Sequence, residues 1–111
     1  MDERQERLGR NEVLFRELNE RIEGVNRFLD DAATDASFVC ECGHGECMER
    51  IRMTLAEYER VRSDPTLFFA VAGHEEPEVE HVVEEHGGWN VIRKDPGGPA
   101  ELASAHDPRG K

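Results

Sequence analysis

Three cysteines lie within eight positions of this chain, and this cluster constrains the fold more than any other feature of the sequence. Cys40, Cys42 and Cys47 follow the spacing C-x-C-x4-C, and Gly43 and Gly45 lie between the last two. Residues i and i+2 of an extended strand share a face, so Cys40 and Cys42 can point at one centre. Because glycine turns easily, the chain can bring Cys47 back to the same centre at little conformational cost.

Thiolates are soft ligands, and structural zinc sites are tetrahedral with Cys and His donors. Three cysteines leave one place for a fourth ligand. We expect His74 to fill it, because Gly73-His74 stands at a predicted strand-to-helix junction that would hold the ring rigidly. His44 is nearer in sequence but lies inside the tight loop, and it remains an alternative. The sequence therefore predicts one structural Zn²⁺ bound by Cys40, Cys42, Cys47 and His74.

Other interpretations of the cysteine cluster remain open. Water, a carboxylate or a helical histidine such as His81 could supply the fourth zinc ligand. The three thiols could also carry no metal at all. An iron–sulfur cluster normally requires four cysteines, so such a cluster would have to be shared between two chains.

The N-terminal part of the chain has the pattern of an amphipathic helix over residues 10–31. Its apolar residues recur at intervals of three and four, as in a heptad repeat: Phe15, Leu18, Ile22, Val25 and Leu29. This stripe could pack against the rest of its own domain. It could equally form a coiled coil with another protein or with a second copy of the chain, which would give a homodimer.

After a small polar linker, two short strands are predicted on either side of the cysteine loop. Phe38-Val39-Cys40 enters the loop, and Ile51 and Met53 alternate with arginines as on a half-buried strand. The two strands could pair as a hairpin. Thr54 and Glu57 then form a capping box, which predicts the start of a short helix.

Further along the chain, residues 67–71 form a nearly continuous apolar run that predicts a central strand. A second short helix is predicted over residues 75–86 and a last strand over residues 89–92. Most of the core is expected from the apolar residues of these elements: Phe38, Ile51, Met53, Leu55, Tyr58, Val61, Phe68, Val71, Val79, Val82 and Trp89.

These elements predict an α+β fold, with a long N-terminal helix followed by a small zinc-stabilised unit that has a three- or four-stranded sheet and two short helices. The predicted division of the chain is a frayed N-terminus (1–9), the heptad-like helix (10–31), a linker (32–37), the compact zinc-binding unit (38–94) and a disordered tail (95–111).

The balance of charge argues against several classes of function. The chain has 25 acidic and 14 basic residues, with a formal net charge of −11. Nucleic acid is a polyanion and normally requires a basic patch, which this sequence lacks. From the charged first ten residues we expect no signal peptide, and the sequence has no apolar run long enough to cross a membrane. We therefore expect a cytoplasmic protein whose partners are proteins, because reduced, clustered cysteines suit that compartment.

No established catalytic motif is present. Gly73-His74-Glu75-Glu76 is superficially similar to a zinc-protease motif, but no second histidine follows at the required spacing. A zinc enzyme would need an open ligand position and a general base such as Glu41, Glu46 or Glu75. The remaining histidines are expected on the surface.

The segments that carry these patterns resemble a group of short bacterial hypothetical proteins. The resemblance rests on Phe38-Val39-Cys40-Glu41-Cys42, Cys47, the run from Thr54 to Arg62, Gly73-His74-Glu75 and the opening helix from Asn11 to Ile22. It would cover residues 11–94. The group has no assigned activity, so the resemblance implies only that the cysteines and His74 belong to one unit.

Two functional hypotheses follow from the sequence. The first is a protein-interaction or regulatory module in which zinc holds the compact part and the helix presents its apolar stripe. The second is a thiol- or zinc-based redox or metal sensor, because zinc-bound thiolates can be oxidised and release the ion. A zinc-dependent enzyme is a further alternative.

Overall fold

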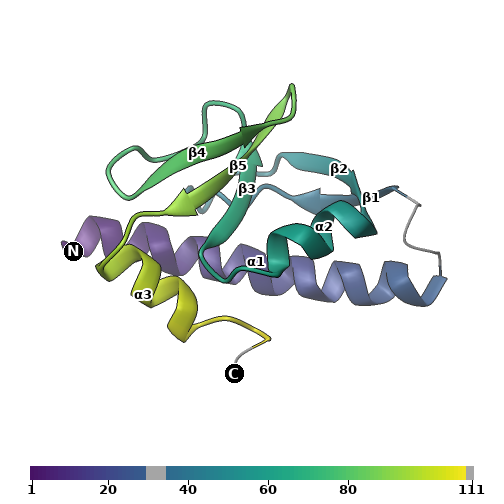
Figure 1. Ribbon diagram of the computed structural model, residues 1–111, viewed down its shortest axis with the longest axis horizontal. Helices are drawn as coiled ribbons and strands as arrows, with labels where there is room; N and C mark the ends of the chain where they lie inside the picture. The colour runs from purple at the N-terminus through teal and green to yellow at the C-terminus, as the bar shows by residue number, and fades with distance from the viewer. Residues whose placement is uncertain (30–34, 110–111) are drawn as a thin grey trace.

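The computed structural model describes residues 1–29 and 35–109 and shows an α+β fold (Figure 1). A long helix is followed by two small antiparallel sheets and two short helices. In chain order the elements are α1 (Glu3–Leu29), β1 (Asp35–Val39), β2 (Arg50–Thr54), α2 (Leu55–Arg62), β3 (Leu67–Val71), β4 (Glu80–Glu85), β5 (Trp89–Lys94) and α3 (Gly98–Ala105).

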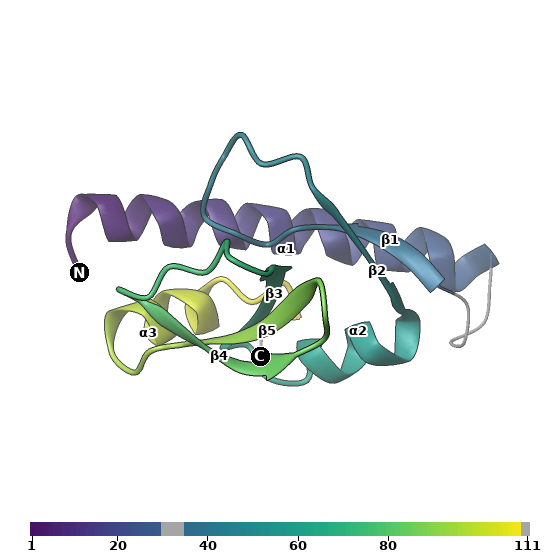
Figure 2. The ribbon, with the colours of Figure 1, turned by 90° about the horizontal axis from the view of Figure 1, so that it is seen from above.

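The strands form two separate sheets rather than the single sheet of three or four strands that we expected. β1 and β2 pair as the predicted hairpin, with Phe38 opposite Ile51. The second sheet has the order β3-β5-β4, so β3 lies at its edge and not at its centre. Its apolar run is explained by burial on both faces, because Phe68 and Phe69 point to opposite sides and both are buried. α1 runs along the whole length of the molecule beside both sheets (Figures 1 and 2).

The start of α2 confirms the capping box. The Thr54 hydroxyl accepts the Glu57 backbone N–H at 3.1 Å, and the Glu57 carboxylate accepts the Thr54 N–H at 2.8 Å. This pair satisfies donors that every helix start leaves free. α2 then turns Leu55, Tyr58 and Val61 into the core, as the sequence predicted.

Aromatic side chains join the two sheets into one core. The ring of Phe38 stacks on Tyr58 with centroids 4.4 Å apart, and the ring of Phe69 meets both edge-on. The predicted core residues lie in or against this cluster, except that Val79 is buried outside it; Val71, Val82 and Trp89 are only partly buried.

The apolar stripe of α1 lies largely outside the core, although Ile22 packs against it. Leu18 and Val25 of that stripe are exposed, and Phe15 and Ile22 are half-buried; the side chain of Leu29 lies outside the described residues. The buried face of α1 is instead largely polar and follows helical spacing: Leu8, Glu12, Val13, Arg16, Asn19 and Glu23. α1 therefore packs on its own domain, but through a different face from the one that the heptad pattern indicated.

Arg16 shows how this polar face is accommodated. Its guanidinium donates to the carbonyl oxygens of Pro65 and Ala103, each at 2.7 Å, and lies 4.5 Å from the centre of the Phe68 ring. A buried charge is tolerated only when its hydrogen bonds are largely satisfied. The side chain consequently joins α1 to β3 and α3.

A second buried contact joins α1 to the three-stranded sheet. The ammonium group of Lys94 donates to the carboxylates of Glu12 and Glu80, and all three side chains are at least 98% buried. Burial, and then the neighbouring Glu80 carboxylate, raise the pKa of Glu12 well above its usual range. This cluster connects α1, β4 and β5 through charge rather than through apolar packing.

The helix predicted over residues 75–86 is wrong, because half of this segment forms β4 and the rest is not helical. Residues 80–85 pair with β5, and a bulge between Val82 and Glu84 shifts the register. Gly87 adopts a φ of 86° in the turn that joins the two strands. The two glycines that seemed to end a helix therefore form a hairpin turn, and tertiary pairing outweighs the acidic residues that suggested a helix start.

Both ends of the described chain are more ordered than the sequence indicated. α1 begins at Glu3, and Leu8 is buried, so residues 1–9 belong largely to the helix. The predicted disordered tail contains α3, in which Ala103 is buried. Beyond α3, Arg109 donates hydrogen bonds to Glu20 and Glu59. Of the predicted linker, residues 32–34 lie outside the described residues and the remainder belongs to β1.

Candidate metal centre

The four residues predicted to bind zinc lie together at one end of β1 and β3. One donor atom from each of Cys40, Cys42, Cys47 and His74 can be chosen so that all four lie within 4.8 Å of one another. The Nδ1 atom of His74 is 3.6 Å from the Sγ atoms of both Cys40 and Cys47. The cluster could therefore hold a metal ion.

These separations match the edge of a zinc coordination tetrahedron. Zinc–sulfur bonds of about 2.3 Å and zinc–nitrogen bonds of about 2.0 Å, at a tetrahedral angle, place ligand sulfur and nitrogen atoms about 3.5 Å apart. The two sulfur-to-nitrogen distances at His74 are therefore compatible with a tetrahedral site, and the four donors all lie within 4.8 Å of one another. The donor set, three thiolates and one imidazole, is one that structural zinc sites use.

Backbone hydrogen bonds hold Cys40 and His74 in position. Cys40 directly follows β1. Its N–H donates to the Glu49 backbone carbonyl at 3.1 Å, and its Sγ accepts the Val71 N–H at 3.2 Å. His74 follows β3 through a tight turn in which Gly73 has a φ of 95°, and its N–H donates to the Val71 carbonyl. The ends of two strands thus aim the two side chains at one point.

The cysteine loop rests on α1. Gly43 packs against Leu8 so closely that a Cβ atom at position 43 would lie 2.8 Å from the Leu8 side chain. Asn11 donates to the Gly43 carbonyl at 2.9 Å. The helix therefore supports the loop from outside, and glycine is required at position 43 by the close approach of the two segments.

The residue between the first two cysteines, Glu41, is fully buried and anchors the loop from inside. Its carboxylate accepts hydrogen bonds from Arg62 at 3.1 Å and from Asn19 at 2.8 Å. Asn19 also accepts the Val39 N–H at 2.8 Å and donates to the Val39 carbonyl at 2.9 Å. Burial raises the pKa of Glu41, and the Arg62 guanidinium opposes that rise. Glu41 is therefore a structural carboxylate with no route to solvent.

Sequence reasoning did not identify Asn11, Asn19 or Arg62 as parts of this site, and it treated Glu41 only as a candidate base. One signal was available. The polar residues of the N-terminal helix recur at Glu12, Arg16, Asn19 and Glu23, which is the spacing of one helix face. An uninterrupted polar face is ordinarily solvent-exposed, so the pattern alone gave no reason to place it inside.

The three thiols differ in their surroundings. Cys40 and Cys42 are buried, whereas Cys47 is half-exposed on the loop. A hydrogen bond from Cys40 lowers the pKa of Cys42 to about 5. That same hydrogen bond and burial raise the pKa of Cys40, and burial raises the pKa of Cys47. The cluster thus favours one thiolate, on Cys42, and a metal ion would have to displace the remaining protons.

His44, the alternative fourth ligand, points to a different neighbour. Its Nε2 atom is 3.0 Å from the carboxylate of Glu76, and its ring centre is 6.2 Å from that of His74. The backbone carbonyl of His44 accepts the Cys47 N–H at 2.9 Å, which closes the loop. His44 thus contributes its main chain to the loop, while its side chain is not among the four clustered donors.

The chain matches no protein-family model, no curated protein and no solved structure. Among the described residues, no helix combines the length and the apolar character that crossing a membrane requires.

Proposed function

We propose that this protein is a small zinc-stabilised interaction module. Cys40, Cys42, Cys47 and His74 bind one structural Zn²⁺, and the outer face of α1 binds a protein partner or a second copy of the chain. The observation that carries the metal part is the placement of His74 Nδ1 at 3.6 Å from two cysteine sulfurs. Four protein donors complete a tetrahedral zinc site, which favours a structural role over a catalytic one.

The interaction part rests on where α1 places its heptad stripe of Phe15, Leu18, Ile22, Val25 and Leu29. Leu18 and Val25 face solvent, and the fold of the monomer does not use them. Phe15 and Ile22 are half-buried and border the same surface. A helix held on a rigid domain by a polar face, with apolar residues left outside, suits docking of another helix or groove.

Metal content tests the first part of this proposal. Wild-type protein purified without added metal should contain one zinc per chain. His74→Ala should lose most of the zinc, and His44→Ala should keep it, because only His74 directs a ring nitrogen at the cysteine sulfurs. Cys42→Ser should lose both the zinc and cooperative unfolding.

The outcomes are distinct. Wild-type protein without metal, under conditions that keep the thiols reduced, would remove the basis of the proposal. Equal loss of zinc in the His44 and His74 variants would show that the ligand set is wrong. A Cys42→Ser variant that keeps its zinc would show the same.

One observation favours the sensor hypothesis as a second candidate: Cys47 is half-exposed while the other two cysteines are buried. A peroxide could reach Cys47, whose thiolate would attack the O–O bond, form a sulfenic acid and release hydroxide. A second thiolate, from Cys40 or Cys42, would then attack that sulfur, form a disulfide and release a second hydroxide. The zinc would lose two ligands and dissociate.

Trapping of sulfenic acid tests this second candidate. At low peroxide, a sulfenic-acid probe should label Cys47 before the buried cysteines, zinc release should follow, and a thiol reductant with added zinc should restore the folded protein. If zinc stays bound at peroxide concentrations that oxidise an exposed free thiol, the site is purely structural.

A further inference from the structure

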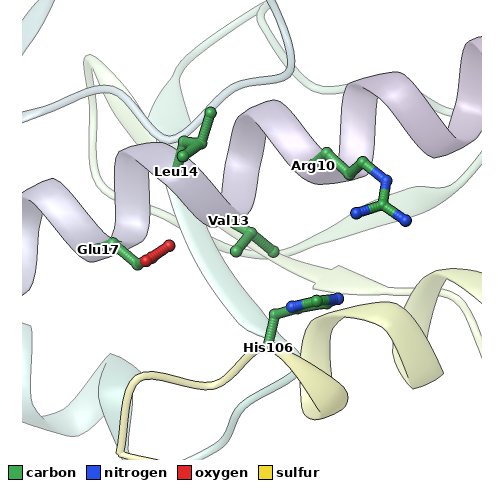
Figure 3. A pocket seen from close by; sticks show the side chains of 5 residues that line it. All are labelled: Arg10, Val13, Leu14, Glu17 and His106. Carbon is green, nitrogen blue, oxygen red and sulfur yellow. The ribbon is translucent and has the colours of Figure 1, made fainter.

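The exposed face of α1 has a pattern that shares Leu18 and Val25 with the stripe seen in the sequence but differs from it in its other members. Leu14, Leu18 and Val25 are 61%, 42% and 60% exposed, and Arg21 lies on the same side of the helix. The spacing of these four residues is four, three and four, which is the a/d repeat of a helix–helix seam. Figure 3 shows Leu14 directed away from α3, whereas Val13 points towards His106.

The charge of this face suits a second copy of the same helix. α1 contains six arginines and six glutamates, so the net charge of −11 arises outside it. Arg4 and Arg27 are already paired with glutamates of the chain. Among the described residues, Glu17 and Arg21 form no salt bridge, although both are exposed at the seam. Two copies that meet through α1 therefore repel each other less than copies that meet through the acidic remainder of the chain. This contact also brings the unpaired opposite charges of Glu17 and Arg21 together.

The position of Arg21 decides the direction of the two helices. A parallel pair would place Arg21 against Arg21 of the other copy in the seam, where two like charges would face each other. In an antiparallel pair, a positions face d positions. Leu18 then faces Arg21 of the second copy, Leu14 faces Val25, and Glu17 lies beside the incoming Arg21 guanidinium.

We propose that two copies of this chain associate through an antiparallel α1–α1 contact, with the twofold axis between Leu18 and Arg21. Leu14, Leu18 and Val25 form the apolar seam, and Glu17 pairs with Arg21 of the second copy at two symmetric places. This proposal rests on the proposed role of α1 as a binding face, and it identifies a second copy of the chain as the binding partner. Because the seam is short, the association is weak and depends on protein concentration.

Charge reversal gives a sharp test by sedimentation equilibrium of the full-length protein. Glu17→Arg should weaken self-association at least about tenfold, because the symmetry of the contact introduces two repulsive pairs. Arg21→Glu should weaken it similarly. An equimolar mixture of the two variants, and the double variant, should regain association, because opposite charges again meet across the seam.

Matched controls separate this local effect from net charge. Glu17→Arg makes the chain less acidic, so general repulsion alone would strengthen association, opposite to the expected result. Glu85→Arg and Arg52→Glu make the same charge changes on exposed strand residues outside α1, and they should not weaken association as the seam variants do. Leu18→Glu should abolish association.

Zinc content and circular dichroism of the same samples distinguish the two proposals. A wild-type protein that binds zinc but stays monomeric at every concentration overturns the dimer and leaves the metal site standing. If the strength of self-association is unchanged by Glu17→Arg, or if a mixture of the two variants stays monomeric, the antiparallel contact is also overturned. Zinc-free protein that shows the full charge-reversal pattern supports the contact while contradicting the zinc site.

Discussion

At the scale of single residues, Asn19 joins α1 to the end of β1 and to the cysteine loop. Its amide pairs with both backbone groups of Val39, as a neighbouring strand would, and it also donates to the buried Glu41 carboxylate. One side chain thus holds the last residue of β1 and the residue between two candidate metal ligands. The cost of removing it comes from the partners left without a hydrogen bond inside the protein.

Asn19→Ala should lower the free energy of unfolding by about 2–4 kcal/mol, because buried groups of Val39 and Glu41 lose their partner. Urea unfolding measures this. Asn26→Ala is the matched control, since within residues 1–29 and 35–109 the Asn26 amide bonds only to the Ile22 carbonyl of its own helix. The control should change stability by no more than about 0.5 kcal/mol. Similar small losses in both variants would contradict the role given to Asn19.

At the scale of elements, the cysteine loop depends on its contact with α1. The loop approaches the helix at Gly43, where a Cβ atom would lie 3.1 Å from the Leu8 Cα atom as well as close to the Leu8 side chain. A backbone atom cannot move aside as a flexible side chain can, so the loop itself would have to shift. The site therefore belongs to the packing of two elements and not to the loop alone.

Gly43→Ala should cost about 1–3 kcal/mol of stability and weaken zinc binding, because the displaced loop carries Cys42 and Cys47. Gly45→Ala tests the same substitution two residues along, where the nearest atom, Asn11 Nδ2, is 3.6 Å from the added Cβ. That variant should keep its zinc affinity. Competition with a chelator measures both affinities, and equal affinities would show that the contact with Leu8 does not position the ligands.

At the scale of the whole molecule, charged groups occupy the boundary between α1 and the sheets. Glu12 shares Lys94 with Glu80, and one oxygen of the Glu12 carboxylate finds no hydrogen-bond partner in the part of the chain that the structure describes. The pKa of Glu12 is raised, first by burial and then by Glu80. An acid whose folded pKa exceeds its unfolded value binds a proton more tightly in the folded state, so its contribution to stability falls as the pH rises between those two values.

Glu12→Gln should therefore be at least as stable as the wild type at neutral pH. Its advantage should shrink as the pH falls towards about 4.3, the ordinary pKa of glutamate, where the unfolded wild type also becomes protonated. Thermal unfolding across this pH range measures the difference. Glu3→Gln, at an exposed position of α1, should follow the wild-type profile. A loss of more than about 2 kcal/mol in Glu12→Gln at neutral pH would instead show that the ionised carboxylate stabilises the fold.

The sequence by itself determined the features that depend on nearby residues. The capping box at Thr54, the hairpin of β1 and β2, and the α+β class with its long first helix follow from local patterns. The grouping of Cys40, Cys42 and Cys47 also follows from their spacing, and His74 lies beside them as predicted, although the turn after β3 does not lead into the helix on which that prediction rested. Steric and hydrogen-bonding preferences over a few residues are sufficient to predict such features.

Only the tertiary structure decided the features that depend on distant partners. Residues 80–85 became a strand because β5 pairs with them, although their acidic start suggested a helix. The polar face of α1 turned inward because Lys94, Glu41 and backbone groups of other elements satisfy its charges and amides. Hydrogen bonds and ion pairs of this kind join residues far apart in the chain, so a pattern of hydrophobicity along the chain cannot predict them.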